Sequence, residues 1–345
     1  MGCETPDAAS ARQHVVPRHT DNRTTRLGFG NALGSGTMRS MLWPLGSTWR
    51  PVRWRRRDAL ELRWLSARTW TRRWYPQGID LGSWRDRPTI AVSWFRQRLD
   101  GVHLASRVTL VDRERARHLD IILVVTGDDG ELEPAPIHAG GLAWFGDRLF
   151  VAATGRGIWE FDLSDIRQVR GADARRLAGA RARRSRATAL VAVRTAVHPV
   201  ALRCSFLGRV FDDDGSPLRR VLIGEHRTDG SGRIGEFSIP EDPEDAFLET
   251  DRFSPDIARM QGAVRWGDRY FVSQSDQLRP GVLWSGPQSA LTRDRAALPV
   301  GCEDLALDLD AELLWTLGEH PWRRVVRGIP FAHLGIGDGG KAQRT

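Results

Sequence analysis

Two stretches of the chain, more than a hundred residues apart, follow the same pattern. Residues 141–151 read GLAWFGDRLFV and residues 262–272 read GAVRWGDRYFV. Each has a Gly, a short apolar run, a Gly-Asp pair and a second apolar run, which is the pattern of a β-hairpin with a two-residue turn. Self-similarity of this kind is typical of repeat architectures, in which each copy builds one unit of a larger fold.

Three weaker copies accompany the two strong ones. Residues 76–95 place a polar turn between Gly78 and the run TIAVSWF, and residues 302–317 align Asp304 with the repeat glycine. The step from Gly141 to the second strong copy is about twice the step from Gly78 to Gly141, so a further copy is expected near residue 204, where CSFLGRVFDDDG stands. Five units, each a meander of three or four short antiparallel strands, predict an all-β fold: a single β-propeller of five to six blades.

The same pattern sets the expected domain boundaries. The propeller is predicted over residues 75–331, and residues 42–74 are expected to form a closing strand or a linker. An Arg/Ala-rich stretch at 170–198 is interpreted as an insertion between blades. Residues 1–41 are predicted to be a disordered segment and residues 332–345 a flexible tail.

Composition limits the partners. The chain has 51 Lys and Arg against 43 Asp and Glu, but Lys341 is its only lysine and no nucleic-acid-binding motif accompanies the arginine clusters. A nucleic-acid partner is therefore not expected. No stretch approaches the roughly 20 apolar residues of a membrane span. The polar N-terminus resembles no signal peptide, which predicts a cytoplasmic location as written; secretion stays open if the true start lies elsewhere. A monomer is expected.

Three cysteines leave few possibilities. Cys3, Cys204 and Cys302 have no metal-site spacing, and at most one disulfide can form. A bridge between Cys204 and Cys302 requires the starts of two strands to lie close together. The alternative is that both are small buried apolar residues.

Polar residues stand just before the repeat glycine of each copy. In propellers the loop entering the innermost strand of each blade opens at one mouth of the central channel, so these residues should converge there. They are Gln77, Gly140 with His138 nearby, Cys204, Gln261, and Glu303 with Asp304. Such a set suits a small polar ligand or a protein loop, and its carboxylate and amide oxygens suit a hard cation. A second acid–histidine pair, Glu319-His320, is placed on a strand, where adjacent side chains point to opposite faces.

The entry motif also supports a resemblance. Pro76-Gln77-Gly78-Ile79 and His138-Ala139-Gly140-Gly141-Leu142 resemble the repeat of SMP-30/gluconolactonase and NHL-type propellers. The stretches WYPQGI at 74–79, HAGGLAWFGDRLFVA at 138–152 and CEDLALD at 302–308 resemble a group of uncharacterised secreted actinobacterial propeller proteins. The resemblance spans about residues 74–330.

The polar residues at the mouth are compatible with two functions. The first is a binding or interaction protein whose mouth holds its ligand on Gln77, His138, Gln261, Glu303 and Asp304, with no cofactor. The alternative is a metal-dependent hydrolase of the lactonase or esterase kind. The lactonase-like relatives hold a divalent cation with a first-blade Glu among its ligands, but here that position is Gln77. The cation, such as Ca²⁺, would then rest on Glu303 and Asp304, with His138 as general base.

Overall fold

The computed structural model describes residues 60–64, 70–115, 117–178 and 187–336, without the side chains of residues 295–297. The segment 1–41, for which disorder is predicted, lies outside these residues, as does the part of the C-terminal tail from residue 337 onward. The described residues all belong to one compact unit that begins at Met41.

Nearly all of the secondary structure consists of four-stranded antiparallel meanders. The first contains β2 (Trp74–Ser83), β3 (Pro88–Gln97), β4 (His103–Asp112) and β5 (Arg117–Thr126). The second contains β7 (Leu142–Phe145), β8 (Arg148–Ala152), β9 (Ile158–Arg170) and β10 (Thr188–His198). The third contains β11 (Phe206–Phe211), β12 (Pro217–Gly224), β13 (Ile234–Ser238) and β14 (Leu248–Phe253). The fourth contains β15 (Met260–Trp266), β16 (Arg269–Gln274), β17 (Pro280–Pro287) and β18 (Thr292–Val300).

The fifth meander is made from both ends of the described chain. It contains β19 (Cys302–Asp308), β20 (Leu313–Gly318) and β21 (Val325–Pro330), and β1 (Leu60–Leu62) pairs antiparallel with β21 as its outer strand. The strand β1 lies within the segment 42–74. A strand from the N-terminal side therefore closes the sheet at the C-terminal side.

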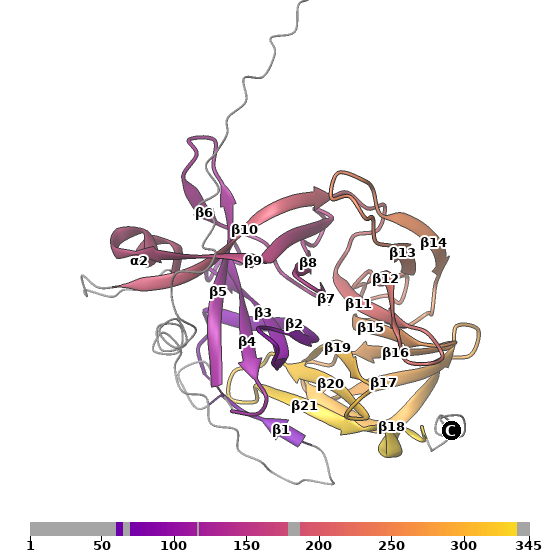
Figure 1. The fold of residues 1–345 in the computed structure, drawn as a ribbon. Coiled ribbons are helices and arrows are strands. Elements are labelled where there is room, and N and C mark those ends of the chain that lie inside the picture. The colour runs from indigo at the N-terminus through magenta and orange to yellow at the C-terminus, as the bar shows by residue number, and fades with distance from the viewer. Residues whose placement is uncertain (1–59, 65–69, 116, 179–186, 337–345) are drawn as a thin grey trace, which may run out of the picture. The chain divides into compact units, whose positions relative to one another are not determined.

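The first strands of the five meanders form a closed ring. Strand β2 contacts β7 and β19, β11 contacts β7 and β15, and β15 contacts β19. Figure 1 shows these strands nearest the centre of the ring, with the later strands of each meander farther out. This arrangement is a β-propeller, so the predicted all-β propeller fold is confirmed.

The two strongest repeats form the hairpins that their sequences predict. Gly146 and Gly267 lie in the β7–β8 and β15–β16 turns with φ of 57° and 56°. This left-handed conformation costs glycine little, which is why a Gly-Asp turn can join two paired strands here.

Hydrophobic clusters fill the spaces between adjacent meanders. Trp144 and Trp159 are buried between the first two, and Trp64, Trp94 and Trp315 between the fifth and the first. Similar clusters lie between the remaining neighbours. The indole rings thus bury the faces that a single meander would expose.

The structure revises one sequence-based expectation and decides between two alternatives for the cysteines. The stretch 170–198, interpreted as an insertion, contains α2 (Gly171–Ala178) and β10, and β10 pairs antiparallel with β9 and parallel with β5. This part of the chain therefore belongs to the sheet, because its alternating apolar residues complete the second meander. Cys204 and Cys302 are both free and buried, so the alternative of two small core residues holds.

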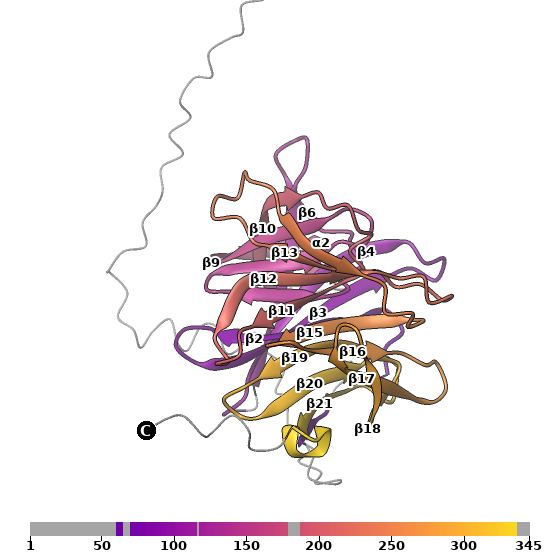
Figure 2. The same cartoon turned by 90° about the vertical axis from the view of Figure 1, so that its right-hand side faces the viewer.

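Two short elements complete the description. Strand β6 (Leu132–Pro134) pairs with β5, and η2 (Phe331–Leu334) follows β21 and packs on β18 and β21 (Figure 2). Among the described residues, no helix is long and apolar enough to cross a membrane.

Candidate functional site

The five inner strands begin on the same face of the propeller, where the predicted site residues are found. On each inner strand, one residue lies where the strands approach each other closely at the axis. The residues just before these positions are Gln77, Gly140, Ser205, Gln261 and Glu303. They and Glu319 are called the mouth below. Four of the five entry positions agree with the sequence prediction. In the third meander the position belongs to Ser205 rather than Cys204, because Cys204 turns into the core with φ of 52°.

Below the mouth, the inner strands approach too closely for most side chains. A Cβ at Gly78 would lie 2.8 Å from the backbone of Gly141, and a Cβ at Gly262 would lie 2.7 Å from the Cα of Asp304. The repeat glycines are therefore required by this contact between strands.

Asp304 ties three inner strands together. Its Oδ2 accepts hydrogen bonds from the backbone N–H of Ile79 at 3.1 Å and of Leu142 at 3.3 Å, and its Oδ1 accepts from Leu305 N–H at 2.9 Å. Burial raises the pKa of this carboxyl well above its usual range, and these backbone donors oppose the shift. Both oxygens of Asp304 are thus engaged by the scaffold.

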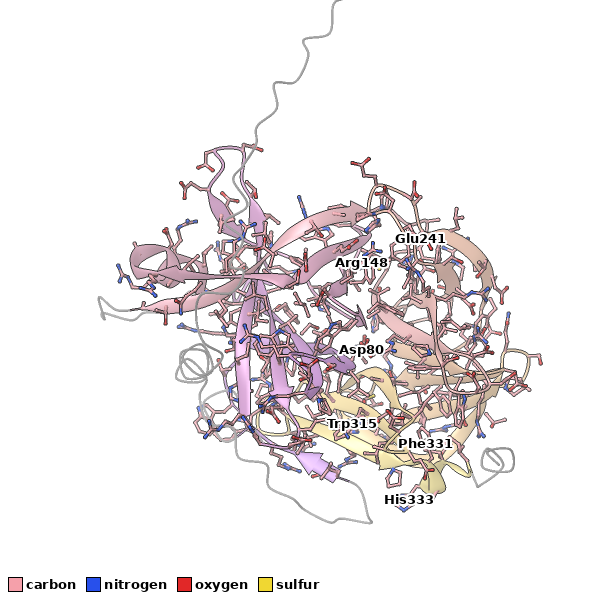
Figure 3. All side chains as sticks on the ribbon, viewed as in Figure 1. Asp80, Arg148, Glu241, Trp315, Phe331 and His333 are labelled. Carbon is pink, nitrogen blue, oxygen red and sulfur yellow. The ribbon has the colours of Figure 1, made fainter. Side chains whose placement is uncertain are left out.

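Asp80 also accepts a backbone hydrogen bond from a neighbouring inner strand, and Figure 3 shows it near the centre of the ring. Its Oδ2 accepts the backbone N–H of Trp144 at 2.6 Å, and Arg209 lies 3.9 Å from its other oxygen. Burial raises the pKa of Asp80 to about 6, against the opposing charge of Arg209. The two aspartates hold β2, β7 and β19 in register at the axis.

On one side of the mouth, two carboxyl groups each meet an amide. Gln261 Nε2 donates to Glu303 Oε1 at 3.3 Å, and Gln77 Nε2 donates to Glu319 Oε2 at 2.9 Å. Glu303 is 1% exposed and Gln77 is 2% exposed. Burial raises the pKa of Glu303 well above its usual range, and the neighbouring carboxyls of Glu319 and Asp304 raise it further.

Glu319 is a mouth residue that sequence reasoning set aside. The sequence predicts that Glu319 and His320 lie on a strand, but β20 ends at Gly318 and both residues lie in the following loop. There His320 Nδ1 is 3.7 Å from Glu319 Oε1. Burial raises the pKa of Glu319, while His320, Gln77 and Arg324 oppose the shift. The signal available in the sequence was the loop sequence GEHP, whose glycine and proline end the strand.

On the other side of the mouth, rings and basic groups gather around His138. Its ring stacks on Phe95 with centroids 4.4 Å apart and lies 5.2 Å from the ring of His103. Burial lowers the pKa of His138 to about 3, and the positive charges of His103, His226 and Arg203 lower it further. His138 is therefore neutral at ordinary pH and is a weak base.

Three buried polar atoms on this side have no hydrogen-bond partner among the described residues. They are His138 Nδ1, Thr154 Oγ1 and Ser205 Oγ. Their loops are in contact: Gly155 N–H donates to the Arg203 carbonyl at 2.6 Å, and a Cβ at Gly140 would lie 3.3 Å from His138 Nδ1 and 2.0 Å from the Ser205 carbonyl oxygen. Because buried polar groups in folded proteins are nearly always paired, these atoms have unused hydrogen-bonding capacity.

A metal ion needs several free oxygen or nitrogen ligands around one point. Within the part of the chain that the structure describes, no three His, Cys, Asp or Glu side chains are grouped as a metal site. Since the oxygens of Asp304 accept backbone hydrogen bonds, the residues do not fit a cation held by Glu303 and Asp304.

Comparison with known proteins found no matching family model and no matching curated protein. Among solved structures, the GH43_1 enzyme from Xanthomonas citri is similar with 12% identity and a TM-score of 0.41, over 77% of this chain and 90% of that chain. A lectin from Aleuria aurantia is similar with 9% identity and a TM-score of 0.37, over 72% of each chain. A gluconolactonase from Xanthomonas campestris, the propeller type that the entry motif resembles, matches with 15% identity and a TM-score of 0.35, over 79% of this chain and 80% of that chain. Likenesses at these levels carry no argument about function, and the propeller is established by the strand pairing described above.

Proposed function

We propose that this chain is a β-propeller binding protein whose mouth takes a small, neutral polar ligand. The observation that carries the proposal is the set of three buried polar atoms without partners, His138 Nδ1, Thr154 Oγ1 and Ser205 Oγ. Leaving a buried donor or acceptor unpaired costs about 1–3 kcal/mol, so a water molecule or ligand that reaches these atoms and pairs with them recovers that free energy.

The chemistry of the mouth selects the class of ligand. The amides of Gln77 and Gln261 are neutral, and the raised pKa values of Glu303 and Glu319 favour their protonated forms. Hydroxyl, amide, imidazole and protonated carboxyl groups can all donate a hydrogen bond and accept one. A compound rich in hydroxyl or carbonyl groups and without charge, such as a sugar or a lactone, is the matching partner.

A second candidate is a hydrolase of the lactonase or esterase kind. It is favoured by the Glu303–Glu319 pair, because a carboxyl group whose pKa is raised by burial can act as a general acid toward an ester oxygen. His138 is a poor general base because its pKa is about 3. The candidate is therefore an acid-assisted reaction at Glu303, without a step assigned to a metal.

Ligand titration by NMR and calorimetry tests the binding proposal, with neutral mono- and disaccharides and sugar lactones as the probes. The Ser205→Ala variant should lose roughly three- to tenfold in affinity, as expected for one hydrogen bond of 0.5–1.5 kcal/mol. It should keep its melting temperature, because the Ser205 hydroxyl has no partner in the protein to lose. Ser289→Ala, at an exposed serine outside the mouth, is the matched control.

The outcomes separate the two candidates. Binding that weakens in Ser205→Ala but not in Ser289→Ala supports the binding protein. Failure of every neutral sugar and lactone to bind, or equal affinity in both variants, would overturn it. Release of the hydroxy acid from a lactone by the wild-type chain, lost in Glu303→Gln, would place the hydrolase ahead.

A further inference from the structure

The loops around the mouth are called the rim below. In each meander the connection from the second to the third strand lies on the mouth face, as does the connection from the fourth strand to the next meander. Backbone hydrogen bonds join neighbouring loops: Gln97 to Arg73, Gly155 to Arg203, Arg259 to Arg227, Ser275 to Arg259, Gly301 to Asp276 and Glu319 to Gly301. These bonds tie several neighbouring loops together, and the side chains considered below are exposed on the loops, unlike the buried atoms proposed above to bind the ligand.

Exposed apolar side chains concentrate on this rim. Among the described residues, the large apolar side chains that are exposed are Trp70, Leu99, Val102, Val197, Leu248, Leu278 and Trp322. All except Leu248 lie in rim loops or at the mouth end of a strand. Single exposed apolar residues are ordinary, but their gathering on one face indicates an interaction surface.

Two of these exposed residues, Trp70 and Trp322, are stacked on each other. The rings of Trp70 and Trp322 are stacked with centroids 5.4 Å apart and an angle of 25° between their planes, although the two residues are 48% and 68% exposed. Trp322 has φ of 71°, a conformation that a bulky side chain rarely adopts. A strained backbone that presents an exposed aromatic ring is typical of a binding loop. The same loop supplies Glu319 to the mouth.

The charges beside the stack are positive and unneutralised. Arg72, Arg73 and Arg323 are exposed, and none of them has an ion pair with a carboxylate of the described residues. The rim acid Asp276, in contrast, accepts hydrogen bonds from the backbone N–H groups of Leu278 and Arg279 and lies 3.7 Å from Arg259.

Part of the opposite face is acidic. Its turns between β11 and β12 and between β13 and β14 expose several carboxylates, and Figure 3 labels one of them, Glu241. They are Asp212, Asp213, Asp214, Glu241, Asp242, Glu244 and Asp245. An acidic segment is therefore attracted to the arginines beside the stack and repelled from these two turns.

We propose that the Trp70–Trp322 stack and the arginines beside it, Arg72, Arg73 and Arg323, form a docking surface for a protein partner. The partner presents an acidic segment that also carries aromatic or aliphatic side chains. Trp and Arg are the residue types that most often dominate the binding energy of protein interfaces. A protein is favoured over an anionic lipid surface because exposed Asp128 and Asp129 lie on the same face, where a flat array of negative headgroups would meet them.

Selection of peptides tests this surface on the full-length chain. A phage library of random 12-residue peptides is panned on the wild-type protein, and synthetic copies of the enriched peptides are titrated by fluorescence polarisation. We expect enrichment in Asp and Glu together with aromatic residues or Leu. Affinity should fall at least tenfold in Trp322→Ala and in Arg323→Glu, and should weaken as salt is raised from about 50 to 300 mM.

Two control variants should leave peptide binding unchanged. Leu248→Ala and Arg115→Glu change exposed residues outside the rim and should bind as wild type. Trp70→Ala repeats the test if Trp322→Ala melts early. Enriched peptides without acidic residues, or affinity unchanged in both tryptophan variants, would overturn the proposal. Sedimentation with phosphatidylglycerol/phosphatidylcholine vesicles, abolished by Trp322→Ala, would also overturn it and assign the surface to lipid.

Discussion

At the mouth, burial shifts the pKa values of acids and bases in opposite directions, and in both cases it disfavours the charged form. The pKa of Glu303 is raised and that of His138 is lowered to about 3, because both groups are removed from water. Neighbouring charges add to each shift: carboxyls stand beside Glu303, and His103, His226 and Arg203 stand around His138. The consequence is that both sides of the mouth favour neutral hydrogen-bonding groups.

The pKa of His138 predicts how stability depends on pH. Between its ordinary value of 6.5 and about 3, the unfolded chain binds a proton on His138 that the folded chain does not bind. Stability is therefore lost as the pH falls below 6.5, by about 2 kcal/mol from this residue at pH 5. Urea unfolding at pH 7 and pH 5 should show a smaller loss in His138→Gln than in wild type. His333→Gln, at an exposed histidine, should follow wild type; a His138→Gln variant that does the same would contradict the assignment.

At the level of elements, close contact between inner strands sets the geometry of the axis. Gly141 faces β11, where a Cβ would lie 2.1 Å from the backbone nitrogen of Leu207 and 2.9 Å from Phe206. Backbone atoms held in a ladder cannot move aside as the end of a side chain can. The carboxyls of Asp80 and Asp304 then satisfy backbone donors at these contacts.

Gly141→Ala should consequently destabilise the propeller by about 3 kcal/mol, the range expected for overpacking a well-packed core. The matched control is Gly127→Ala, whose new Cβ would meet the side chains of Asp129 and Glu133 at 3.1–3.3 Å. Those carboxylates are exposed or half-buried and can shift, so we expect a change within about 0.5 kcal/mol. Chemical unfolding curves measure both, and equal stability of the two variants would show that the inner strands are not in tight contact.

For the whole molecule, the ring closes through a strand from the N-terminal side. Strand β1 pairs with β21, and the buried carboxylate of Glu61 accepts a hydrogen bond from Arg327 Nε at 2.9 Å across this pair. The Arg327 and Arg63 guanidinium groups oppose the effect of burial and keep the pKa of Glu61 below its usual value. An ion pair thus reinforces the closure, where both ends of the described chain meet.

Because backbone N–H groups already engage both oxygens of Asp304, the stability of the ring should not depend on a cation at the mouth. After chelation, addition of Ca²⁺, Mg²⁺ or Zn²⁺ should leave the melting temperature unchanged. A ligand of the folded state at about a hundred times its dissociation constant would instead add roughly 2.7 kcal/mol. A cation-specific rise in melting temperature that disappears in Glu303→Gln would contradict this expectation and support the metal-dependent hydrolase.

What the sequence by itself determined is local. The Gly-Asp hairpins, the repeat of the strands and the entry positions of Gln77, Gln261 and Glu303 could be predicted because turn chemistry and strand periodicity depend on adjacent residues. Tertiary structure decided the pairing of β1 with β21, the engagement of Asp304 by Ile79 and Leu142, and the place of Ser205. It also decided that Glu319 meets Gln77. These contacts join segments distant in sequence, and the pKa shifts at the mouth arise from the burial that ring closure imposes.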